Sequence, residues 1–241
     1  MKEAVRHWLA EINAAQKREK DYREEGKRIL NIYAGNKAVA TPFNILYSNT
    51  ETLLPATYSQ VPRPVVQRRF KDEDPIGKAA AQAATRVLEF LLDTNIDGYE
   101  CFDDGMKAAT LDALLPGRGV TQVKYDAEVV QGEVTYKASE LVCVDSKDWS
   151  KVLVGYAKKW SECPWVSFEL QMDKKEAKEK FGAVADKLKY TTNNQDVEGL
   201  DEDKTAEERH EGEKKTVCVY QIWDKEGGKK IRYLCPEYKD D

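Results

Sequence analysis

The hydrophobic pattern of this chain changes its period near Pro116-Gly117, and this change limits the possible folds more than any other feature. Upstream, apolar residues recur at the 3.6-residue spacing of helices. Downstream, residues 120–125 alternate between two sets of side chains with the two-residue period of a strand. The sequence therefore predicts an α+β protein, with a helical N-terminal half followed by a β-rich layer that contains one further helix.

Five segments are expected in chain order. They are an N-terminal helical arm at 1–40, a helical region at 41–116, a β-rich region at 117–190 with a helix at 173–189, an acidic flexible loop at 191–215 and a C-terminal β-hairpin at 216–241. Helical spacing predicts individual helices at 3–33, 76–94 and 99–115. Ala80 and Ala84 mark a small-residue face that would allow another helix to approach closely.

Turn and cap residues define the elements of the second half. Gly117 is expected to stop the preceding helix in the left-handed conformation, and a phosphate-binding loop is less favoured there because the glycines precede a strand. A hairpin is expected with Gly132 near its turn, and Asp173 is expected to cap the following helix. Further strands are predicted at 141–149, 151–160 and 160–170, and the first of these could also be a strand that runs into a turn.

Four tryptophans fall in the β-rich half, at Trp149, Trp160, Trp165 and Trp223. We expect them in the core of the β layer. A partly exposed tryptophan would instead mark an interface.

The stretch Thr41–Phe70 begins as an amphipathic helix. Thr41 is expected to cap it, Pro42 to occupy its first position, and Pro55 to kink or end it. Its apolar stripe consists of Phe43, Leu46, Tyr47, Leu53, Leu54 and Tyr58. The other face is uncharged and polar, which suggests contact with another protein or a ligand. The candidate interface residues on it are Asn44, Ser48, Asn49 and Thr52.

The stretch ends as an extended, proline-containing segment that carries Arg63, Arg68 and Arg69 and no acid. On a regular strand, Arg63 and Arg69 would share a face and Arg68 would oppose them. These arginines could pair with acids of a neighbouring subunit or of the same chain, contact the phosphates of nucleic acid, or stay on the surface.

The composition limits the kinds of function and binding site that the chain is expected to have. The net charge of −5 argues against a protein that coats DNA, although a local basic strip remains possible. The five cysteines are widely spaced, so we expect reduced thiols. The two histidines, His7 and His210, neighbour no nucleophile. We therefore expect no catalytic, cofactor or metal site. The acidic run Asp201–Asp203 is at most a weak cation site. We expect no signal peptide and no membrane span.

Several segments resemble those of a known family. They are NILYSNTETLLPATYSQVPRPVVQRRF, DPIGKAAAQAATRVLEFLL and CFDDGMKAATLDALLPGRGVTQVKYD, followed by weaker likeness in WSECPWVSFELQMDKKEAKEKFG and VCVYQIWDKEGGKKIRYLC. This pattern resembles the N-terminal part of the portal proteins of tailed bacteriophages. The specific block is 43–119, and the likeness touches most of residues 1–238.

The resemblance implies a portal wing-like fold and a structural virion protein without catalysis or cofactor. Portal subunits form a ring, typically of twelve, that nucleates head assembly at one capsid vertex and lets DNA enter and leave. The implied partners are further copies of the chain, the major capsid protein, the terminase motor, the head–tail adaptor and, non-specifically, double-stranded DNA. The implied location is the virion, after assembly in the bacterial host cytoplasm. Because portals are usually longer, residues 1–241 are expected to represent the N-terminal wing region.

Two other classes stay open. One is a head–tail adaptor or another capsid-associated interaction protein. The other, less favoured, is a nucleic-acid-binding domain or a metal-dependent nuclease.

Overall fold

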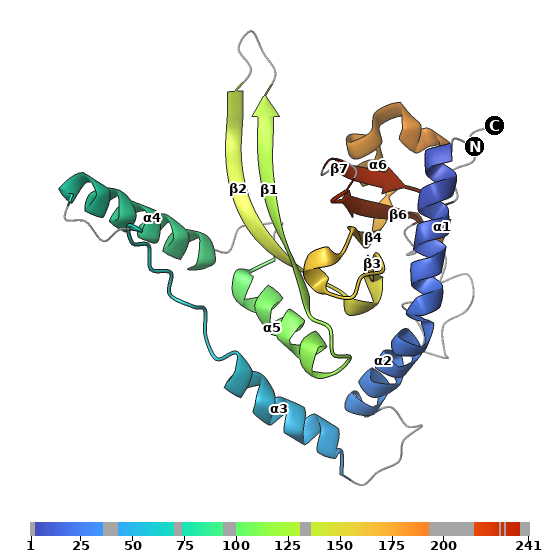
Figure 1. The fold of residues 1–241 in the computed structure, drawn as a ribbon, viewed down its shortest axis with the longest axis horizontal. Helices are drawn as coiled ribbons and strands as arrows, with labels where there is room; N and C mark the ends of the chain where they lie inside the picture. Colours follow the sequence, from blue (N-terminus) through green and yellow to red (C-terminus); the bar gives the residue numbers. More distant parts are fainter. Residues whose placement is uncertain are drawn as a thin grey trace, which may run out of the picture. The chain divides into compact units, whose positions relative to one another are not determined.

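The computed structural model confirms the predicted fold class: helices lie mostly in the N-terminal half, followed by a β-rich part with one further helix (Figure 1). It describes residues 3–35, 43–69, 74–93, 100–130, 136–192, 215–226, 228 and 230–236. Among these residues, no helix is both long enough and apolar enough to cross a membrane.

The chain divides into two compact units. Unit 1 contains residues 1–20 and 151–241, and unit 2 contains residues 21–150. The N-terminal helix thus belongs to the same unit as the C-terminal strands. The two units therefore do not follow the chain order of the five expected segments.

Unit 1 is built on an antiparallel sheet with the strand order β3-β4-β6-β5, in which β7 also pairs with β6. The strands are β3 (Val152–Val154), β4 (Trp165–Asp173), β5 (Thr191–Thr192), β6 (Lys215–Asp224) and β7 (Lys230–Leu234). Strand β6 is central, since it pairs with β4 on one side and with β5 and β7 on the other. The predicted C-terminal hairpin is therefore present, as β6 and β7, but it is part of a larger sheet.

Helices cover both faces of this sheet. Helix α1 (Glu3–Arg18) packs on one face, where its Ile12 meets a cluster that includes Tyr220 and Ile222. Helix α6 (Lys174–Phe181) and the 3-10 helix η3 (Gly182–Lys187) pack on the other face, against Val217 and Val219. The alternation of side chains along β6 sends these two residue pairs to opposite faces.

Two predicted helices in the chain are shorter than expected. The predicted helix at 3–33 is two helices, because α1 ends at Arg18 and α2 (Lys20–Tyr33) follows. The helix expected at 173–189 ends at Phe181, where Gly182 takes a positive φ of 60°, and continues only as η3. Its cap is confirmed: Asp173 accepts from the Glu176 backbone N–H at 2.8 Å, and the Glu176 carboxylate accepts from the Asp173 N–H at 3.0 Å.

The tryptophans divide into two groups. Trp149, at the start of the 3-10 helix η1 (Trp149–Lys151), and Trp165 are buried, as expected. Trp160, in the 3-10 helix η2 (Trp160–Glu162), is 69% exposed, and Trp223 is also partly exposed. The expectation of a core position is therefore wrong for these two.

Unit 2 combines four helices with a two-stranded ribbon. Its elements after α2 are α3 (Ile45–Thr57), α4 (Pro75–Asp93), α5 (Phe102–Leu114), β1 (Val120–Val130) and β2 (Tyr136–Lys147). Helix α5 packs on both α3 and the ribbon. Gly117, with a φ of 84°, follows α5 and confirms the predicted helix stop.

The ribbon confirms the predicted hairpin, with Val120 opposite Lys147 and Val130 opposite Tyr136. The expected turn residue, Gly132, lies outside the described residues. Of the two interpretations of residues 141–149, the strand that runs into a turn is present: residues 141–147 form the second half of β2, and Trp149 begins η1. They do not form a further separate strand.

Candidate interaction surface

The extended segment at 61–68 joins α3 to α4 and forms no helix or strand. One edge of it is fixed to α4: the Val66 backbone N–H donates to the Thr85 hydroxyl at 3.2 Å, and that hydroxyl donates to the Ala81 carbonyl at 3.0 Å. The intervening side chains Arg63 and Val65 are exposed. The segment therefore presents one edge to α4 and the other to solvent.

The three arginines of this segment have different environments. Arg68 pairs with Asp74 within the chain at 2.6 Å, and Asp74 caps α4 by accepting from the Ile76 and Gly77 N–H groups. Arg63 and Arg69 are exposed. Residues 61–68 form no regular strand, so the sharing of one face by Arg63 and Arg69, which was derived for a strand, stays a prediction.

Helix α4 exposes its apolar face. None of its 19 residues is buried, and Ile76 is 80% exposed, with Val87 at 58% and Phe90 at 62%. Ala80 and Ala84 are also exposed, so the close helix contact expected there is not made within the described chain. The amphipathic pattern predicted the helix correctly, but Ile76, Val87 and Phe90 on its apolar face remain exposed among the described residues.

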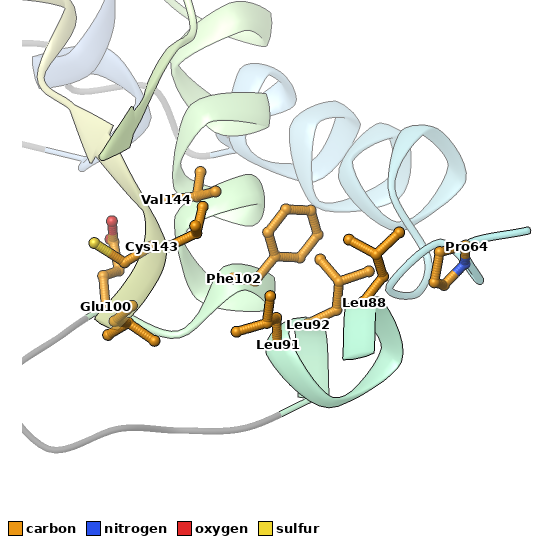
Figure 2. Close-up of a pocket in the computed structure, with 10 residues that line it drawn as sticks. Pro64, Leu88, Leu91, Leu92, Glu100, Phe102, Cys143 and Val144 are labelled. Carbon is orange, nitrogen blue, oxygen red and sulfur yellow. The ribbon is translucent and has the colours of Figure 1, made fainter. Parts of the chain in front are cut away.

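The C-terminal half of α4 borders a pocket of about 160 Å³ in unit 2. Figure 2 shows Leu88, Leu91 and Leu92 of α4 near Phe102 at the start of α5, with Cys143 and Val144 of β2 beyond it. Pro64 of the extended segment also lines this pocket. The pocket lining is mostly apolar, which suits an aliphatic or aromatic side chain.

Helix α3 turns part of its predicted apolar stripe inward, together with Thr50 of the predicted polar face. Thr50 is buried and its hydroxyl donates to the Leu46 carbonyl at 2.8 Å, while Leu46 and Leu54, one turn to either side, are half-buried. Of the expected apolar stripe, Phe43, Tyr47 and Leu53 are exposed. Phe43, Tyr47 and Leu53 are therefore exposed apolar side chains of their own, separate from those of α4.

The four polar residues proposed as an interface on α3 fall into two groups. Ser48, Asn49 and Thr52 are exposed and available for contact. Asn44 instead caps the helix: its Oδ1 accepts from the Tyr47 N–H at 3.0 Å, and its Nδ2 donates to the Ile32 carbonyl at 2.6 Å. The predicted cap, Thr41, and the predicted first helical residue, Pro42, lie outside the described residues, and α3 begins at Ile45. Pro55 lies in the last turn of α3, which ends at Thr57, as predicted.

A second link holds α3 to α2. The Tyr33 hydroxyl donates to Glu51 Oε1 at 2.6 Å, and this hydrogen bond to a carboxylate raises the pKa of Tyr33 to about 12. The Tyr33 and Tyr47 rings lie 5.3 Å apart. Together with Asn44, this contact fixes the N-terminal part of α3 while leaving its outer face open.

The described part of the chain lacks a cluster of metal-ligating side chains. Within it, no three His, Cys, Asp or Glu side chains are placed to hold a metal ion, while Asp201–Asp203 and His210 lie outside it. The five cysteines form no disulfide, and burial raises the pKa of Cys218 to about 12, which keeps that thiol protonated.

A scan against protein-family models and a search of curated proteins found no match to this sequence. The exposed surface of α3, the extended segment and α4 is therefore interpreted from its own geometry. Its exposed apolar side chains and Arg63 are suited to binding another protein surface. Sequence periodicity marked the apolar faces but carries no signal for whether the same chain covers them.

Proposed function

We propose that this chain is a subunit of a homo-oligomeric ring of the portal type, which in tailed bacteriophages sits at one capsid vertex and passes double-stranded DNA. The observation that carries the proposal is the uncovered apolar face of α4. An exposed apolar face of this kind in a folded chain marks a contact with another macromolecule. In a ring, the same surface on each subunit is covered by its neighbour.

Three features in one sequence block support this proposal. The outer face of α3, the extended segment and the face of α4 are all exposed. They follow one another between residues 43 and 93, inside the block that resembles portal proteins. The net charge of the chain is −5, which suits a channel in which DNA slides without being held.

The test is assembly of the full chain, measured by light scattering over a range of concentrations. Val87→Glu places a carboxylate at the centre of the α4 apolar face, where a neighbouring subunit would bury it. Because burying an unpaired charge is costly, we expect subunit association to weaken at least tenfold, equivalent to about 1.4 kcal/mol or more. The wild-type chain should form a defined oligomer.

Gln82→Glu is the matched control, since it adds the same carboxylate to an exposed position on the polar side of the same helix. It should assemble like the wild type. A wild-type chain that stays monomeric under assembly conditions, or equal assembly of both variants, contradicts the proposal.

Electron microscopy of the oligomer separates the portal from its nearest alternative. A ring with an axial channel and long stem helices in the assembled particle supports the portal. A ring without them supports a head–tail adaptor, which shares the capsid vertex.

A further inference from the structure

Unit 1 contains an open cleft of about 780 Å³ where α1 passes the ends of β4 and β6. Two tryptophans line it, Trp8 from α1 and Trp165 from β4, whose rings meet edge to face at 6.1 Å. Glu11 fixes the second ring, since its carboxylate accepts from the Trp165 indole N–H at 3.2 Å. The cleft therefore has an aromatic wall in a defined orientation.

The cleft is acidic. Four carboxylates line it, from Glu3, Glu11, Asp224 and Glu226, against a single arginine, Arg232. Arg232 is already engaged: its Nε donates to Asp224 at 3.3 Å, and its guanidinium lies 5.9 Å from the Trp8 ring. The remaining carboxylates beside two indoles form an environment that favours a guanidinium or ammonium group, through both charge and cation–π attraction.

The extended segment of unit 2 has the complementary chemistry. Arg63 stands between Pro62 and Pro64, and each proline restricts the backbone to extended or polyproline geometry. The contacts of Val66 and Pro64 hold one edge of the segment. Arg63 and Val65 project from the other edge, and Val65 is 74% exposed. A preformed proline-flanked segment loses little entropy on binding, and aromatic-lined grooves are the usual receptors for such segments.

We infer that Arg63 of one copy, with the adjoining residues 61–65, docks in the acidic tryptophan cleft of a second copy. The inference rests on the proposed function, because it supplies the contact between ring subunits. The cleft and the segment are different surfaces of the same chain, so the contact is heterologous. Repeated contacts of this kind close into a ring or extend into a filament.

Charge reversal tests the contact from both sides. The segment variant is Arg63→Glu, with Lys27→Glu, an exposed cation on α2, as its control. The cleft variant is Glu3→Lys with Glu226→Lys, and its control reverses two exposed carboxylates elsewhere in unit 1, Glu162→Lys with Glu179→Lys. All four should fold, as checked by circular dichroism, because every substituted side chain is exposed.

Each test variant should associate at least tenfold more weakly than the wild type in light scattering, and each control should match the wild type. An equimolar mixture of the two test variants should regain assembly, because the glutamate of one then meets the lysines of the other. A single chain carrying both sets of changes should regain it as well.

The outcomes that overturn the inference are distinct from failure of the proposed function. If Val87→Glu prevents assembly but both charge-reversed variants assemble normally, the oligomer stands and the cleft contact is wrong. If the combined chain recovers but the mixture does not, the segment docks in the cleft of its own chain. A wild-type chain that is monomeric throughout overturns both.

Discussion

The indole of Trp149 lies directly against Gly26, so a methyl group at residue 26 would overlap the aromatic ring. Trp149 is 3% exposed, and the Tyr22 ring meets it edge to face at 5.6 Å. This contact joins α2 to the residue that follows the β1–β2 ribbon. Trp149 is therefore the anchor that holds α2 within unit 2.

Gly26→Ala should destabilise the chain by about 1–3 kcal/mol, because the added methyl forces the indole out of its packed position. In an exposed helix the same substitution would stabilise, since alanine is the better helix former. Gly105→Ala in α5 is the comparison and should cost less, because the nearest atom to the added methyl is a Glu100 carboxylate oxygen at 3.1 Å, so the overlap is smaller. Urea denaturation measures both, and an equal effect of the two substitutions would contradict the role given to Trp149.

Asn44→Ala should cost about 1–2 kcal/mol, because it removes the cap of α3 and the amide bond to the end of α2. Asn49→Ala is the matched control on the exposed face of the same helix, and it should be neutral or slightly stabilising. Thermal unfolding monitored by circular dichroism compares them. Similar melting temperatures for the two variants would show that the Asn44 contacts contribute little.

Ser167 lies in β4 between Leu153 of β3 and Ile222 of β6, with 0% of its surface exposed. Its hydroxyl has no hydrogen-bond partner among the described residues. Ser167→Ala removes this unpaired polar group, so we expect stability to stay within about 1 kcal/mol of wild type or to rise. Thr216→Val, which deletes a hydroxyl that donates to Gln171 at 3.1 Å, should instead lower it. A large loss from Ser167→Ala in chemical denaturation would reveal a partner for the hydroxyl.

Signals from neighbouring residues in the sequence were sufficient to predict local structure. The Asp173 cap, the Gly117 helix stop and the β1–β2 hairpin each depend on residues close in the chain, and each is present. The break between α1 and α2 had no such signal. Charged residues continue through it, and the periodicity alone predicted one helix.

These local signals could not predict contacts between residues that are far apart in the chain. Nothing near Ile12 indicates that it packs on strands formed at the other end of the chain, beside Ile222. The roles of Asn44 and Trp160 were missed for related reasons. A polar residue at a helix start can cap or bind, and an aromatic residue near a strand can lie on either side of it.

We predict that Asp112 makes the free energy of unfolding depend on pH. Burial raises its pKa to about 6, opposed by a hydrogen bond from the Trp149 backbone N–H and aided by the nearby Asp148 carboxylate. In the unfolded chain the pKa is about 4, so the folded state binds the proton more tightly. Its contribution to stability is therefore complete below pH about 4 and is lost as pH rises through about 6.

Asp112→Asn keeps the acceptor for the Trp149 N–H and removes the buried charge. It should raise the free energy of unfolding at pH 7.5 by about 1 kcal/mol, allowing for solvent screening of a partly exposed group, and leave it unchanged near pH 3.5. Denaturation at both pH values measures the difference. Asp104→Asn, an exposed carboxylate on the same helix, is the control and should show no comparable gain at pH 7.5. An equal effect of Asp112→Asn at the two pH values would mean that titration of this carboxylate does not set the stability of unit 2.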